Sequence, residues 1–141
     1  MIIAFFKKLL QLLQIGNPAE RLFRRFDENR TALEAQFFER AGAAGSPRGL
    51  RWIKCEWLDS RCLLKDRSNG QPCLLVSVNL SFEAIEGGDM ENVAAVSMIR
   101  DACAVFQMTA NGWQASGRAL FNMNPQEAQE KLATSYAPFL S

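Results

Sequence analysis

The chain has 141 residues, of which 48% are hydrophobic and 22% are charged. These proportions are typical of a folded globular protein and exclude an intrinsically disordered or membrane-embedded one. The length fits one domain that folds without a disulfide or a metal. The net charge of +1 hides an asymmetry: residues 1–54 carry ten Lys or Arg against five Asp or Glu, and residues 55–141 carry six against ten. The two halves either attract each other or turn the first half toward an anionic surface.

Residues 1–15 predict a short amphipathic helix with an unusually wide apolar face. At about 100° per residue, the polar side chains fall within about a third of the circumference. The remaining apolar arc must be covered by the protein's own core, a second copy, a protein partner or lipid. The candidate interaction residues are Ile2, Phe5, Phe6, Leu9, Leu12 and Leu13, together with Lys7 and Lys8 on the polar side.

The same segment does not fit a targeting or membrane-spanning role. Lys7 and Lys8 interrupt the apolar run, and Gly16-Asn17-Pro18 does not provide a signal-peptide cleavage site. The segment is also shorter than the ~20 residues that cross a bilayer. We therefore expect a cytoplasmic protein with an amphipathic helix at residues 1–16 and a single α+β domain at residues 17–141. Peripheral contact with an anionic membrane is the lesser alternative, because surface-seeking helices usually carry more basic residues.

A second helix is predicted to begin at Asn17-Pro18-Ala19-Glu20, where a capping residue precedes proline at the first helical position. The apolar residues that follow recur at helical spacing, so this face is expected to pack on an apolar surface. They are Leu22, Phe26, Leu33 and Phe37. The Gly- and Ala-rich segment 41–47 ends the helix.

The chain then changes to a β pattern. Residues 50–58 and 61–65 flank Asp59-Ser60 and predict an antiparallel hairpin. Residues 74–84 alternate strictly, which predicts a strand with one apolar core face and one wet face. The wet face comprises Ser77, Asn79, Ser81 and Glu83. Residues 90–99 fit a short helix and an irregular crossing equally well.

Residues 101–108 and 113–121 bracket Asn111-Gly112, a pair whose positive φ angles suit a tight hairpin. The segment that starts at Asn124-Pro125 repeats the capping pattern and predicts a short helix that includes Tyr136. Helices and strands are segregated along the chain. We therefore predict an α+β fold in which N-terminal helices pack on a curved antiparallel sheet of about five strands, with a short C-terminal helix.

This pattern resembles the cystatin-like and nuclear-transport-factor-like α+β folds. A long N-terminal helix on a curved sheet carries the likeness, together with a hairpin from Val105-Phe106-Gln107 to Asn111-Gly112-Trp113-Gln114. The helix after Phe121 departs from the common pattern. The resemblance implies a cone-shaped cavity or a dimerising sheet, and it transfers no functional residue to this chain.

The sequence contains no histidine, which excludes Ser-His and Cys-His nucleophile pairs and imidazole metal ligands. Four cysteines form no C-x-x-C pair, so we expect reduced thiols packed as small hydrophobes, and neither a metal nor a cofactor. They are Cys55, Cys62, Cys73 and Cys103.

Tryptophan and arginine together suit nucleic-acid stacking, but the near-neutral charge lacks the basic footprint of such a protein. We therefore expect no nucleic-acid partner, and we expect Trp52, Trp57 and Trp113 to fill the core or pack under a helix.

Two hypotheses for the function follow. The first is a non-enzymatic interaction or accessory module whose N-terminal helix docks on a protein partner or forms a homodimer. The alternative is a small-molecule-binding or enzymatic pocket between the long helix and the sheet, with Asp101 or Glu56 as an inward acid or base.

Overall fold

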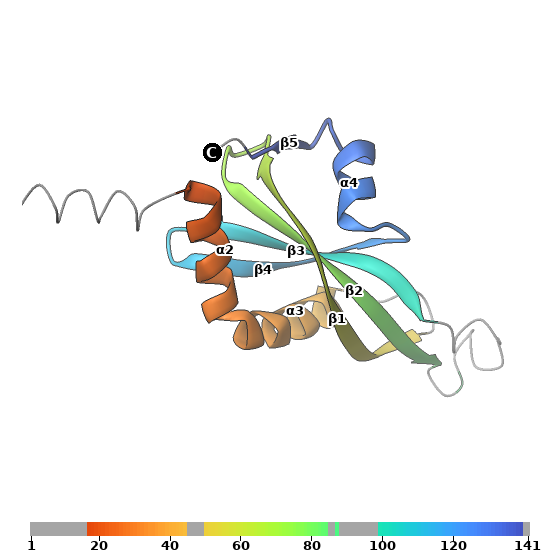
Figure 1. Cartoon of the computed structure of the whole chain (residues 1–141). Helices are drawn as coiled ribbons and strands as arrows, with labels where there is room; N and C mark the ends of the chain where they lie inside the picture. The colour runs from red at the N-terminus through yellow and green to blue at the C-terminus, as the bar shows by residue number, and fades with distance from the viewer. Residues whose placement is uncertain (1–16, 45–49, 85–86, 88–98, 140–141) are drawn as a thin grey trace, which may run out of the picture.

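A computed structural model describes residues 17–44, 50–84, 87 and 99–139. Figure 1 shows helices α2 and α3 on one side of a curled sheet and helix α4 on the other. The α+β class is therefore confirmed, with helices on a curved antiparallel sheet of five strands and a short helix near the C-terminus.

The predicted second helix is divided into α2 (Pro18–Glu28) and α3 (Arg30–Ala44). Asn17 caps α2 as expected, because its side-chain oxygen accepts a hydrogen bond from the Ala19 N–H at 2.9 Å. Proline at the first position removes no hydrogen bond from the helix, because a backbone N–H at that position would have no partner within the helix.

The division of the long helix falls at Asn29. Its N–H bonds to the Phe26 carbonyl, and its side-chain amide donates to the Arg25 carbonyl at 3.1 Å. Asparagine favours such breaks because its side chain competes for backbone hydrogen bonds. The expected apolar stripe spans both helices and is buried; it comprises Leu22, Phe26, Leu33 and Phe37.

All strand pairs are antiparallel, in the order β4-β3-β2-β1-β5. The strands are β1 (Leu50–Asp66), β2 (Pro72–Ala84), β3 (Arg100–Thr109), β4 (Gly112–Phe121) and β5 (Tyr136–Pro138). The hairpin between β3 and β4 is confirmed, with Thr109 opposite Gly112. Gly112 has φ +102° and Asn111 does not have a positive φ, so the positive φ at this turn comes from Gly112 alone and not from an Asn-Gly pair.

The hairpin predicted at Asp59-Ser60 is wrong, because β1 runs through it as one strand. The register passes from Trp57 opposite Val78 to Arg61 opposite Val76, so residues 58–60 bulge opposite one residue of β2. A bulge absorbs turn-forming residues without reversing the chain. Because β1 replaces two predicted strands, the fifth strand of the sheet is β5, which pairs with the end of β1.

An aromatic core fills the space between α2–α3 and the sheet. Phe26 lies edge-on to Phe106, with ring centroids 4.9 Å apart, and Phe37 lies edge-on to Trp57 at 5.4 Å. The Trp113 indole N–H donates to the Leu22 carbonyl at 2.9 Å, which ties α2 to β4. Edge-to-face geometry is the favoured arrangement of aromatic pairs.

The outer face of the sheet, opposite α2 and α3, is covered at one end. The prediction that this face of β2 is wholly exposed to solvent is therefore wrong. Cys73, Leu75 and Val105 on this face form a second core with Ala128 of α4 and Tyr136 of β5. Ser77 is buried, and the polar face becomes exposed only further along the strand, at Glu83.

Helix α4 (Pro125–Lys131) begins where its capping pattern predicts, with reciprocal hydrogen bonds between Asn124 and Glu127. It ends earlier than predicted, because Tyr136 belongs to β5 and is buried against the sheet. In the part of the chain that the structure describes, no helix is long and apolar enough to cross a membrane.

Candidate functional site

The sheet register places the two candidate carboxylates on either side of one asparagine. Glu56 on β1 lies opposite Asn79 on β2, which lies opposite Asp101 on β3. Directly opposed residues point to the same face, so the three form a row across the outer face, away from α2 and α3. Glu56 and Asp101 are exposed, two strand spacings or about 10 Å apart at the backbone. Among the described residues, neither carboxylate makes a hydrogen bond or an ion pair.

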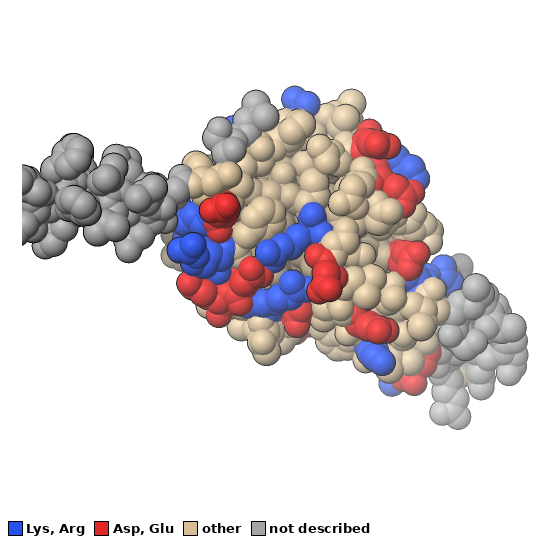
Figure 2. Space-filling view, in the orientation of Figure 1, with Lys and Arg blue, Asp and Glu red and all other residues tan. Residues whose placement is uncertain are grey.

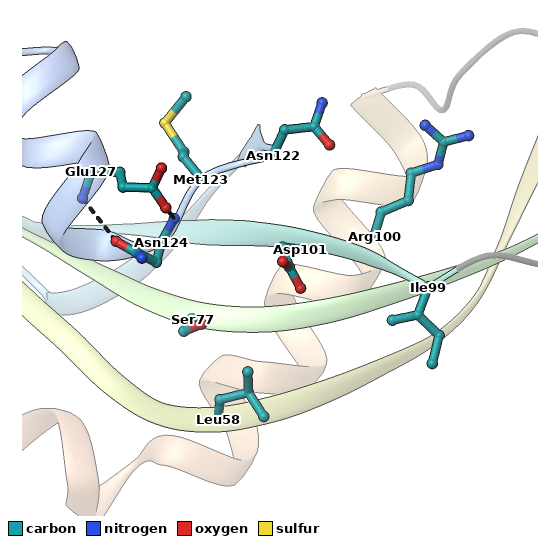
Figure 3. Close-up of a pocket in the computed structure, with 9 residues that line it drawn as sticks. All are labelled: Leu58, Ser77, Ile99, Arg100, Asp101, Asn122, Met123, Asn124 and Glu127. Atoms are coloured by element: carbon teal, nitrogen blue, oxygen red, sulfur yellow. Dashed lines mark hydrogen bonds between the residues drawn. The ribbon is translucent and has the colours of Figure 1, made fainter.

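A pocket of about 580 Å³ opens on this outer face, beside α4. Figure 3 shows Leu58, Ser77 and Asp101 coming from three neighbouring strands. It is lined by Leu58, Ser77, Ile99, Arg100, Asp101, Asn122, Met123, Asn124 and Glu127. The alternative hypothesis expected a pocket on the opposite face, where the aromatic core lies.

One polar side-chain atom in this region is buried without a hydrogen-bond partner among the described residues, and a second polar side chain near it makes no hydrogen bond there. Ser77 is only 9% exposed, and among the described residues its hydroxyl makes no hydrogen bond. The Oδ1 atom of Asn79 is buried and likewise has no partner in the described part of the chain. Buried polar groups are normally hydrogen-bonded, so each exception needs an explanation.

The turn before α4 forms the upper wall of the pocket. Asn122 has φ +62°, and its N–H bonds to the Asp101 carbonyl at 2.7 Å. Asparagine tolerates this left-handed conformation better than other side chains. Asn124 and Glu127 are held by the capping box, so their positions depend on the α4 terminus.

The described residues contain no group of three or more Cys, Asp or Glu that could hold a metal ion. The arrangement therefore offers hydrogen bonding and charge. Its carboxylates lie at the surface and lack an acid–base partner in the described regions, so general acid–base chemistry has no assembled pair here.

The four cysteines are free, as expected from their spacing. Burial raises the pKa of Cys73 and of Cys103 to about 12, and that of Cys55 to about 11. It also raises the pKa of Cys62. Because the thiolate is the nucleophile, these thiols are poor nucleophiles at neutral pH.

The three tryptophans belong to the inner core, as expected. Trp113 is 6% exposed, and Trp52 and Trp57 pack against the same cluster. On the face seen in Figure 2, acidic and basic side chains are interspersed over α2 and form no extended basic surface. Neither feature matches a stacking platform for nucleic acid.

The predicted interaction residues of segment 1–15 lie outside the described residues, as does residue range 90–98. Sequence reasoning assigned Ser77 and Asn79 to a solvated face and did not connect them with Asp101. Ser77 and Asn79 precede a glycine-rich break, and Asp101 starts the next strand. If these two strands are assumed to pair, their register brings the three residues together. Register requires the pairing partner and is not encoded in one strand's alternation.

Comparison with protein-family models, with curated proteins and with solved structures found no match.

Proposed function

We propose that this protein is a non-enzymatic cytoplasmic interaction module that binds a protein partner, or a second copy of itself, through residues 1–15. The observation that carries the proposal is the wide apolar arc predicted for that segment, beside a folded body in which the described residues form two core clusters.

The body supports this proposal because its helices already cover the inner face of the sheet. Leu22 and Phe26 of α2 and Leu33 and Phe37 of α3 are buried there. The capping oxygen of Asn17 also satisfies a backbone N–H of the first turn of α2, so α2 can begin without a preceding helical turn. We therefore expect the helix predicted at residues 1–15 to be available for a partner.

The described chemistry supports a binding role over catalysis. Glu56 and Asp101 are exposed, and burial holds the thiol pKa values high. A helix layer on one face of a curled antiparallel sheet also supports a cystatin-like or nuclear-transport-factor-like fold, and these folds serve binding modules as well as enzymes.

A protein partner is favoured over a membrane because segment 1–15 carries two lysines. Each basic residue near an anionic surface contributes about 1 kcal/mol, an attraction that salt weakens. An interface formed by Phe6 and Leu13 is instead mainly hydrophobic and is insensitive to salt.

The test uses the full chain with Phe6→Glu and Leu13→Glu, which lie on one side of the predicted helix, and Lys7→Gln with Lys8→Gln as the matched control. We expect self-association in light scattering, or cross-linking to a protein partner, to be lost only in the glutamate variant, with thermal unfolding unchanged.

Three results would contradict the proposal. Unfolding of the glutamate variant would assign the segment to the core. Salt-sensitive pelleting with anionic liposomes, lost in the lysine variant, would assign it to a membrane. A monomeric wild-type chain whose residues 1–15 resist protease would show that the segment has no external partner.

A further inference from the structure

A second cavity, of about 450 Å³, lies where the turn between β1 and β2 meets the segment that leads into β5. Figure 1 shows this turn beside β5. The two segments are joined by hydrogen bonds from one residue. The Arg67 N–H donates to the Ser135 carbonyl at 2.9 Å, and the Arg67 Nε atom donates to the Ala133 carbonyl at 2.9 Å. These bonds fix one wall of the cavity and place the Arg67 guanidinium on it.

A second guanidinium reaches the same cavity from the far edge of the sheet. Arg118 belongs to β4 and Tyr136 to β5, the two edge strands. The Arg118 Nη1 atom donates to the Tyr136 hydroxyl oxygen at 3.3 Å, and both residues line the cavity. Because Tyr136 is only 4% exposed and belongs to the second core, it gives Arg118 a fixed anchor.

The hydrogen-bonding groups that remain in the cavity are donors. A guanidinium has five N–H groups and no acceptor. Neither Arg67 nor Arg118 forms an ion pair with a carboxylate of the described residues. The Tyr136 hydroxyl accepts from Arg118, while its own proton has no acceptor in the described part of the chain. A ligand that satisfies these groups must supply acceptors.

One carboxylate, that of Asp66, also lines the cavity. Its Oδ1 atom accepts from the N–H and the hydroxyl of Ser68, at 2.8 and 2.6 Å, so it is engaged within its own turn. Two guanidinium groups against one carboxylate leave the charged side chains of the lining with a net positive charge. An anion is therefore favoured over a cation.

We propose that this cavity binds the phosphate group of a small phosphate monoester. Such a group carries a charge of about −1.5 to −2 at pH 7 and three acceptor oxygens. It can therefore engage both guanidinium groups, whose planar N–H pairs match phosphate oxygens, and the Tyr136 hydroxyl. A carboxylate has a single charge and two oxygens, which is too few for all three donors.

The size of the cavity fits a phosphorylated small molecule, since about 450 Å³ is within the range of small-molecule sites. The site uses no residue of segment 1–15. Its failure and the failure of the proposed interaction module are therefore separate results.

The test is an NMR titration of the isotope-labelled full chain with glycerol 3-phosphate. Glycerate and glycerol serve as matched ligands, with a carboxylate and with no charge. We expect saturable shifts of the Arg67, Ser135 and Tyr136 amides with glycerol 3-phosphate, weaker shifts with glycerate and none with glycerol.

Variants of the full chain then locate the binding. Arg118→Gln should weaken glycerol 3-phosphate binding at least about tenfold, as expected for hydrogen bonds to a charged group. Arg118→Lys keeps the charge without the planar fork and should recover only part of the affinity. Tyr136→Phe removes one hydroxyl donor and should cause a smaller loss. Arg21→Gln changes the net charge equally at an exposed position outside the cavity and should leave binding unchanged.

Absence of saturable shifts at the cavity amides would overturn the proposal. An equal loss in Arg118→Gln and Arg21→Gln would also overturn it, because net charge alone would then explain the attraction. Glycerate that binds as tightly as glycerol 3-phosphate would contradict the choice of phosphate. If Tyr136→Phe does not fold, the two variants of Arg118, whose side chain is exposed, decide alone.

Discussion

The carboxylate of Asp27 on α2 accepts two hydrogen bonds from the guanidinium of Arg61 on β1, at 2.5 and 3.0 Å. The same guanidinium lies 4.5 Å from the ring centroid of Phe23. Arg61 is therefore held between a carboxylate and an aromatic face, an arrangement for which arginine is better suited than lysine. The contact joins the helix layer to the β1 bulge that replaces the predicted hairpin.

Asp27→Asn should lower the free energy of unfolding by about 0.5–1 kcal/mol at neutral pH, since the pair is partly exposed. The hydrogen bond from Arg61 holds the pKa of Asp27 below its ordinary value of 3.8. Because folding lowers the pKa of Asp27, its contact with Arg61 stabilises the protein fully above the ordinary pKa. This stabilisation is lost as the pH falls through the folded-state pKa. Denaturant unfolding from pH 7 to pH 2 should show the two proteins converging in acid.

The control for this comparison is Asp59→Asn, an exposed carboxylate in the same bulge. It should change stability by less than about 0.5 kcal/mol and show no such convergence. An equal loss in both variants would mean that general charge, not the Arg61 contact, is responsible.

Phe106 is the centre of the inner core, fully buried and in ring contact with Phe26, Phe37 and Trp57. Phe106→Ala should cost about 3–5 kcal/mol, because it removes buried apolar surface and leaves a cavity. Urea unfolding measures the loss. Ile53→Ala, at a side chain that is 50% exposed, should cost far less; a loss of comparable size there would contradict this assignment of the core.

Periodicity alone predicted the inner layer of this fold. The spacing of Leu22, Phe26, Leu33 and Phe37 identified the buried face even though Asn29 divides the helix, because the stripe depends on which side chains are apolar. The capping pattern at Asn124 similarly identified the start of α4, since a cap is a local interaction.

The outer face could not be predicted in the same way. Whether this face of β2 is wet or buried depends on α4 and β5, which return from the end of the chain and pack against Cys73 and Leu75. The Asp59-Ser60 pair has the composition of a turn, and only pairing with β2 converts it into a bulge. The candidate site could not be predicted for the same reason, because only the register of β2 and β3 places Asn79 opposite Asp101.

Gly117 lies at a bulge of β4 with φ +82°, and a Cβ there would meet the Arg40 Cβ at 3.4 Å. Gly117→Ala should therefore lose about 1–2 kcal/mol from backbone strain, with a further loss from contact with α3. Gly70→Ala is the matched control, because Gly70 has φ +72° but open space around it. Thermal unfolding should show the larger loss at Gly117, and equal losses would mean that α3 yields without cost.

Buried thiols provide a probe of the outer core. Burial raises the pKa of Cys73 and Cys103 to about 12, so at pH 8 their thiolate fraction is about a thousandfold below that of an ordinary thiol. Both should resist iodoacetamide in the native protein, whereas the half-buried Cys62 should react first, and all should react equally in denaturant. Peptide mass spectrometry over time measures the order. Native alkylation of Cys73 or Cys103 at the rate of Cys62 would mean that α4 and β5 open readily, since only local unfolding would expose these thiols at that rate.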